Sequence, residues 1–111
     1  MKYDLSKIVT RSNGEAIETT KGQMTLRDAL VIMLESQPID VDAEGGAKAR
    51  VPTMKETMDR IAVLGKINSA ADGLADLTAE DVALLKPLAL VSLAYPVAMF
   101  ALLALEHPIG E

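Results

Sequence analysis

Acidic residues alternate in the segment DVDAEGG, which begins at Asp40 and has the opening pattern of a calcium-binding loop. Asp40, Asp42 and Glu44 occupy alternate positions, and Gly45 follows them. The twelfth position of such a loop needs a carboxylate that binds the ion through both oxygens, but here that position is Val51. The spacing therefore predicts a solvated acidic loop and no metal site.

The other residues that could do chemistry lack the partners that catalysis needs. His107 is the only histidine, and no serine or cysteine nucleophile pattern lies near it, although acid–base catalysis requires a positioned partner. Gly45 and Gly46 lack the GxxxxGK[ST] pattern of a phosphate-binding loop. We therefore expect no enzyme activity, no catalytic residue and no cofactor.

Composition and charge point to protein partners. The chain has 111 residues and a net charge of −5, and half of its residues are hydrophobic although only 3% are aromatic. The net negative charge argues against direct nucleic-acid binding, which relies on clustered Lys and Arg. Without cysteine there are neither disulfides nor thiolate metal ligands. The length predicts a single domain over residues 1–111 with an aliphatic core.

Local patterns predict a β-hairpin and then a first helix. Asn13-Gly14, between two β-branched runs, predicts a hairpin over about 7–20 with a type I′ turn. Thr25 followed by Asp28 has the form of a capping box, and apolar residues then recur at helical spacing over about 26–36.

Three further helices are expected over about 54–67, 79–94 and 96–106. Thr53 and Thr78 stand at the starts of the first two, Pro87 permits a kink, and Pro96 suits the first turn of the last helix. Five residues form the expected core-facing side of helix 54–67: Met54, Met58, Ile61, Ala62 and Leu64. The irregular segment 37–52, which contains Pro and Gly, is expected to be a mobile loop.

The stretch from Leu88 to Leu105 reads LALVSLAYPVAMFALLAL and carries no charged side chain. It approaches the roughly 20 apolar residues that a membrane-spanning helix needs. Pro96 within it, and the lack of a basic cluster on either flank, argue against a span. The other elements each have one apolar face that must pack against apolar surface, so we expect this stretch to form the buried core beneath them. A tail-anchor span and an interfacial segment remain alternatives.

Five short segments set the order of elements along the chain: DLSK, an Asn-Gly turn, MTLRDAL, LTAED, and a Tyr-Pro break before an apolar helix that ends in Leu-Glu. In this order they resemble a broad group of short proteins encoded by tailed phages and prophages. The resemblance implies a small accessory or morphogenesis protein, similar in size and helical character to tail-assembly chaperones. It implies residence in the host cytoplasm or the virion, and it assigns no functional residue.

We therefore expect an α+β protein in which an N-terminal β-hairpin packs on three to four helices. It would act by protein–protein contact in phage particle assembly, either as an assembly factor or as a small structural component. Apolar surface left uncovered by the other elements would form the interface. The candidate interface residues are Met99, Phe100, Leu102 and Leu103. The expected partners are further copies of the chain and other phage proteins, and a membrane is disfavoured.

Two other functions stay open. A phage-encoded inhibitor of a host defence or nucleic-acid enzyme would present the acidic surface of Asp40, Asp42 and Glu44. A small tail-anchored membrane protein would instead insert the apolar stretch into a membrane.

Overall fold

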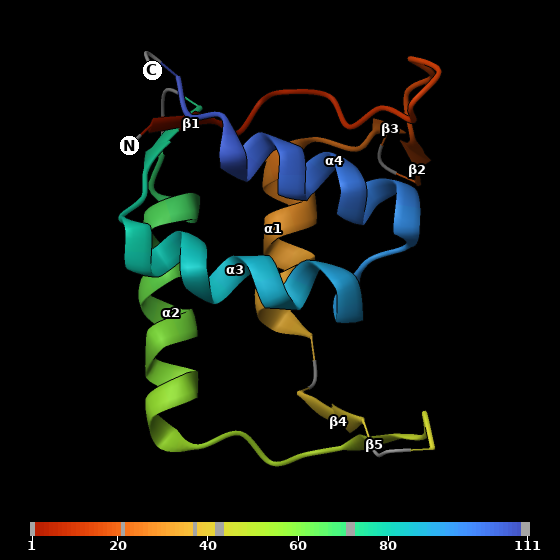
Figure 1. Ribbon diagram of the computed structural model, residues 1–111. Helices are drawn as coiled ribbons and strands as arrows, with labels where there is room; N and C mark the ends of the chain where they lie inside the picture. The colour runs from red at the N-terminus through yellow and green to blue at the C-terminus, as the bar shows by residue number, and fades with distance from the viewer. Residues whose placement is uncertain (1, 21, 37, 42–43, 71–72, 110–111) are drawn as a thin grey trace.

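The computed structural model describes residues 2–20, 22–36, 38–41, 44–70 and 73–109 (Figure 1). Within these residues the chain forms six short strands and four helices. The elements are β1 (Lys2–Asp4), β2 (Glu18–Thr19), β3 (Gly22–Gln23), α1 (Leu26–Glu35), β4 (Ile39–Val41), β5 (Ala47–Ala49), α2 (Met54–Asn68), β6 (Leu74–Asp76), α3 (Ala79–Ser92) and α4 (Tyr95–Glu106). The predicted α+β class is confirmed, and about half of the chain is helical.

The strands form three antiparallel pairs, β1 with β6, β2 with β3, and β4 with β5. Tyr3 lies opposite Ala75 in the β1–β6 pair, and Lys2 also bridges to Ile109. These pairings hold the first described residues beside the connection from α2 to α3 and beside the segment after α4 (Figure 1).

The predicted type I′ turn at Asn13-Gly14 is wrong. Such a turn needs positive φ at both residues, and only Gly14 has it, with a φ of +89°. The backbone N–H of Gly14 donates to the carbonyl of Arg11 at 2.9 Å, and Arg11 donates to Glu15 at 2.8 Å. The Asn13 side chain accepts a hydrogen bond from the N–H of Glu15 at 3.0 Å, which stabilises a three-residue loop instead. The bridge between Thr10 and Ala16 closes this loop, whereas β2 and β3 pair further along.

Three threonines cap the N-termini of helices at the predicted positions. The side chains of Thr25, Thr53 and Thr78 each accept a hydrogen bond from the backbone N–H three residues later. Asp28 and Asp81 return the interaction to complete capping boxes at α1 and α3. α3 continues through Pro87 to Ser92, two residues short of the predicted end. α4 begins at Tyr95, one residue before its predicted start, so the break falls at residues 93–94 and not at Tyr95-Pro96.

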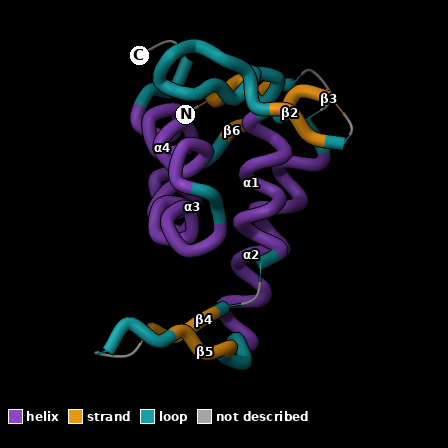
Figure 2. Tube along the Cα trace, turned by 90° about the vertical axis from the view of Figure 1, so that its right-hand side faces the viewer, coloured by secondary structure: helices purple, strands orange, loops and turns teal. Residues whose placement is uncertain are grey.

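The segment 37–52, expected to be an irregular mobile loop, is not irregular throughout, because β4 and β5 lie within it. Asp40 stands opposite Lys48 in their antiparallel register. Apolar and charged residues alternate in both strands, Ile39–Val41 and Ala47–Ala49. Between them Gly45 adopts a φ of +83°, which suits a chain reversal. Figure 1 and Figure 2 show this pair set apart from the body of the fold.

α1 occupies the centre of the molecule and packs against the other three helices (Figures 1 and 2). Leu30 and Met33 of α1 are fully buried, together with Leu85 of α3 and Ala101 of α4. Within the described residues no polar or charged residue is buried. Apart from Tyr3 and Met33 the buried core residues are aliphatic, as the composition predicts. None of the helices in the described part of the chain is long and apolar enough to cross a membrane.

The predicted core face of α2 is wrong for most of its residues. Four of the five residues are exposed: Met54, Met58, Ile61 and Ala62. Leu64 is half-buried, and the residues of α2 that do enter the core are Val63 and Ile67.

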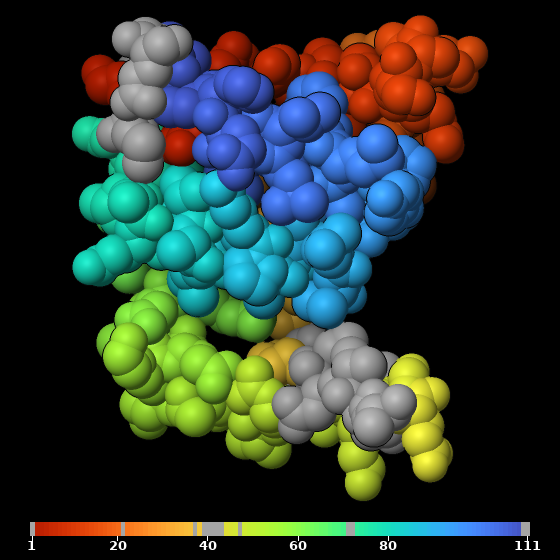
Figure 3. Space-filling view, viewed as in Figure 1, coloured from red at the N-terminus to blue at the C-terminus, as the bar shows by residue number. Residues whose placement is uncertain are grey.

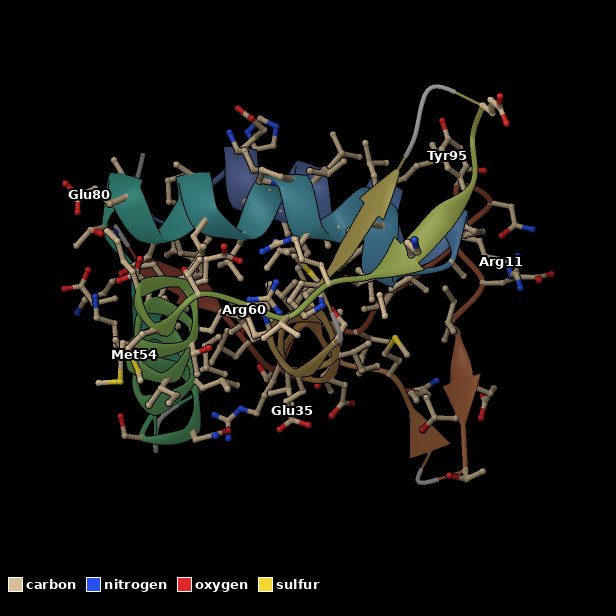
Figure 4. The ribbon with its side chains drawn as sticks, turned by 90° about the horizontal axis from the view of Figure 1, so that it is seen from below. Arg11, Glu35, Met54, Arg60, Glu80 and Tyr95 are labelled. Carbon is tan, nitrogen blue, oxygen red and sulfur yellow. The ribbon has the colours of Figure 1, made fainter. Side chains whose placement is uncertain are left out.

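Polar partners explain why α2 turns its other side inward. The guanidinium of Arg60 donates to the carbonyl of Ser36, just beyond α1, at 2.8 Å. Glu56 accepts two hydrogen bonds of 2.9 Å from Arg50. Figure 4 shows Arg60 pointing toward α1, whereas Met54 points away from the body. The carbonyls at the end of α1 need donors, and Arg60 supplies them only if α2 takes this rotation.

Candidate protein interface

A line of exposed apolar residues runs along α4. Tyr95, Met99 and Leu103, which we define as the α4 stripe, are 70%, 43% and 61% exposed. They are spaced four residues apart and therefore share one face of the helix. Val97 and Ala101 lie on the opposite face and are buried. The amino-acid pattern of α4, apolar on every side, does not reveal which face is covered, but the packing on α1 and α3 decides it.

The structure divides the four residues predicted as an interface. Met99 and Leu103 belong to the exposed stripe, whereas Phe100 and Leu102 are half-buried and pack against the core. Tyr95 was not in the predicted set, although its position four residues before Met99 would have placed it on the same face.

Contacts at its C-terminal end hold α4 in place. The hydroxyl of the buried Tyr3 donates to the carbonyl of Leu105 at 3.1 Å. Lys86 of α3 forms an ion pair with Glu106. The hydrogen bond and the charge of Lys86 hold the pKa of Glu106 below its ordinary value of 4.5. The N-terminal end is different, because Ala94 provides no side-chain cap and the first turn contains no acidic residue.

A shallow groove of about 280 Å³ lies between α4 and the loop that follows β1. One wall is mostly polar and comes from residues 10–13, and the other is the apolar surface of Pro96, Met99, Phe100 and Leu103. Nζ of Lys7 lies 5.6 Å from the centre of the Phe100 ring. Figure 3 shows this loop, in orange, beside the blue surface of α4.

α3 extends the exposed apolar surface. Leu90 and Val91, near its C-terminal end, are 61% and 52% exposed, and α3 lies beside α4 (Figure 1). Together with the α4 stripe they belong to the stretch without any charged residue. Uncharged, exposed apolar surface of this kind is typical of protein-interaction sites.

A second exposed line of apolar residues lies on α2. We define Met54, Met58 and Ile61, which are 77%, 55% and 54% exposed, as the α2 stripe. An ion pair of 2.9 Å between Lys55 and Asp59 runs beside it. Sequence reasoning missed this surface because it assigned the same residues to the core.

The predicted acidic surface is described only in part. Asp42 and the side chain of Asp40 lie outside the described residues, and the backbone of Asp40 belongs to β4. Glu44 is exposed.

A cleft of about 580 Å³ between α2 and α3 is lined by several charged residues. Its charged lining consists of Lys55, Asp59, Glu80 and Asp81. Lys55 is paired with Asp59, and Asp81 accepts a hydrogen bond of 2.5 Å from Lys66. Across the described ranges, no group of three or more His, Cys, Asp or Glu residues is arranged to hold a metal ion. The exposed His107 follows the last residue of α4.

No protein-family model, curated protein or solved structure matches this chain.

Proposed function

We propose that this chain is a non-enzymatic protein that binds a protein partner through the α4 stripe and the adjoining groove. The observation that carries the proposal is that Tyr95, Met99 and Leu103 are exposed within a stretch of 18 residues that carries no charge. Exposing this surface to water is unfavourable, and covering it with a partner recovers about 25 cal/mol per Å² of apolar area. The groove adds a polar wall that orients what binds there.

The biological setting that we propose is phage particle assembly, with the chain as an assembly factor or a small structural component. Support comes from the ordered segments DLSK, MTLRDAL and LTAED, which resemble short tailed-phage proteins. An assembly role requires reversible contact between proteins and no chemistry, which suits an uncharged apolar surface on a small helical domain.

A matched pair of substitutions tests the surface. Leu103→Glu places a charge in the α4 stripe, and Ile61→Glu places the same charge at a similar exposure in the α2 stripe. The proteins encoded beside this gene would be co-expressed with each variant, and complexes would be measured by native mass and titration calorimetry. We expect Leu103→Glu to weaken the complex by roughly 30-fold or more and Ile61→Glu to leave it unchanged.

Neutralising the acidic segment tests the inhibitor function in the same assay. A variant that combines Asp40→Asn, Asp42→Asn and Glu44→Gln should bind the partner as the unsubstituted chain does. If this variant alone loses binding and Leu103→Glu retains it, the proposed interface is wrong and an acidic inhibitory surface takes its place.

A further inference from the structure

We infer that a second copy of this chain covers the α4 stripe, through an antiparallel pairing of the two α4 helices about a two-fold axis at Met99. The inference rests on the proposed function, because it uses the same surface and names its occupant. Three features of α4 lead to it: the spacing of the stripe, the absence of charge along it, and the unequal ends of the helix.

The spacing of the stripe is symmetric about Met99. Tyr95 precedes Met99 by four residues and Leu103 follows it by four. A two-fold axis at Met99 therefore sets Tyr95 of each copy against Leu103 of the other, and Met99 against itself. Such a contact is isologous, since the same surface serves on both copies, and it closes at two subunits.

The charges of the chain favour this face for self-contact. Each copy carries a net charge of −5, so most faces would bring like charges together. The stretch from Leu88 to Leu105 contains no charged residue, so copies that meet there avoid that repulsion.

The two ends of α4 complement each other in the antiparallel arrangement. α1, α2 and α3 each begin with a threonine cap and have an acidic residue in the first turn, whereas α4 has neither. Glu106 lies seven residues after Met99, so it falls on the same face as the stripe, and it is exposed. The antiparallel pair brings Glu106 of each copy beside the uncapped, positive end of the other α4. A parallel pair would leave both N-terminal ends without an acidic neighbour.

Disulfide cross-linking reads out the arrangement, because the chain has no cysteine of its own. Paired helices lie about 8–10 Å apart, so facing positions at the axis fall within disulfide reach. We expect Met99→Cys to cross-link with itself under mild oxidation. Tyr95→Cys alone should not cross-link, because position 95 lies four residues from the axis in each copy. The two substituted positions are then eight residues apart along the helix direction, about 12 Å, which is beyond disulfide reach. A mixture of Tyr95→Cys and Leu103→Cys should cross-link.

A parallel pair gives the opposite result and overturns the arrangement. In that case Tyr95→Cys and Leu103→Cys would each cross-link alone, and their mixture would give no additional product. A chain that stays monomeric in sedimentation equilibrium at every concentration tested also overturns the inference.

Variants of the stripe test the surface by sedimentation equilibrium. Leu103→Glu should raise the dimer dissociation constant by roughly 100-fold or more, because the charge enters the contact twice. Ile61→Glu, at similar exposure on α2, should leave the constant unchanged. Circular dichroism would verify that both variants are folded. A dimer that Ile61→Glu disrupts and Leu103→Glu does not would place the contact on α2 and contradict the inference.

A third comparison isolates the contribution of the helix ends. Glu106→Gln should raise the dissociation constant by roughly 3- to 30-fold, because two interactions between a carboxylate and a helix N-terminus are lost per dimer. Lys86→Gln removes the ion pair within one copy but keeps Glu106, so it serves as the control. Equal effects of the two substitutions would show that the pair with Lys86, and not the second copy, accounts for the loss.

The outcome for the dimer is separable from that for the proposed function. If the chain is monomeric but Leu103→Glu still abolishes binding to another protein, the α4 stripe is an interface for a different partner. If neither self-contact nor partner binding depends on Leu103, both proposals fail.

Discussion

Arg60 decides which side of α2 meets α1. Its guanidinium donates to the carbonyl of Ser36 at 2.8 Å and to that of Leu34 at 3.4 Å. α1 has no basic residue in its own last turn, so this side chain supplies both donors and positive charge at the negative end of the helix. A polar side chain on the inner face thereby leaves the α2 stripe exposed.

Removing this guanidinium should destabilise the fold. We expect Arg60→Met to lower the free energy of unfolding by roughly 1–3 kcal/mol, because carbonyls at the end of α1 lose charged donors. Urea denaturation measures the change. Lys55→Met breaks an exposed, solvent-screened ion pair on the same helix and should change the free energy of unfolding much less. An equal loss in both variants would contradict the role of Arg60 at α1.

Asp81 links the start of α3 to α2. Its carboxylate accepts hydrogen bonds from the backbone N–H of Thr78 at 3.0 Å and from Nζ of Lys66 at 2.5 Å. Burial by itself would raise the pKa of Asp81, but the hydrogen bonds and the charge of Lys66 together lower it below 3.8.

This lowered pKa predicts a pH dependence. The unfolded chain binds a proton at Asp81 more readily than the folded chain does. The ionised Asp81 therefore contributes its full stabilisation of the fold at pH values above 3.8, the ordinary pKa of the group. The effect is lost as the pH falls through the lower pKa of the folded state. We expect Asp81→Asn to reduce the decline in unfolding free energy on acidification, measured by denaturation at a series of pH values. A decline as steep as in the unsubstituted chain would contradict this.

At the scale of elements, Pro87 stands inside α3, which nevertheless continues to Ser92. A proline there removes a backbone donor to the carbonyl of Ala83, and its side chain is exposed to solvent. Pro96 is in the first turn of α4, where no donor is lost. Pro87 therefore destabilises its helix, whereas Pro96 does not.

Replacing Pro87 should stabilise α3. We expect Pro87→Ala to raise the free energy of unfolding by about 1–2 kcal/mol, because alanine restores the backbone hydrogen bond within the helix. The gain is smaller than the full cost of a proline in a helix, because removing proline also makes the unfolded chain more flexible and so favours unfolding. Thermal unfolding measures the shift. Pro96→Ala serves as the control and should not stabilise. A loss of stability in Pro87→Ala would mean that α3 requires the geometry that proline imposes.

At the scale of the whole molecule, two apolar stripes lie on different helices. Pairing of α4 with α4 covers one of them and leaves the α2 stripe exposed. If the two stripes instead bound each other between copies, the contact would be heterologous and would build rings or filaments. The mass of the assembly therefore distinguishes these arrangements.

A closed dimer predicts a thermal midpoint that depends on protein concentration. Dissociation accompanies unfolding of a dimer, so the midpoint should rise over a roughly hundredfold increase in concentration. Met58→Glu should behave like the unsubstituted chain, because Met58 lies on the α2 stripe. Leu103→Glu should unfold at a midpoint that does not vary with concentration. Differential scanning fluorimetry provides the measurement, and a concentration-independent midpoint in the unsubstituted chain would contradict the dimer.

The sequence alone determined the features that depend on neighbouring residues. Thr25 and Thr78 cap helices because their hydroxyls reach an N–H three residues away, and Pro96 suits a first turn whatever surrounds it. These interactions are complete within one turn of chain, so the residue pattern is sufficient to predict them. The aliphatic character of the core followed from composition in the same way.

Only the tertiary structure decided which faces are buried. α2 carries apolar residues on more than one side, and its rotation depends on Arg60 reaching carbonyls 24 residues earlier in the chain. α4 is apolar all round, so its exposed face is whatever α1 and α3 leave uncovered. The pairing of β1 with β6 likewise joins segments some 70 residues apart. Burial is a property of contacts between distant segments, and no local pattern in this chain contains that information.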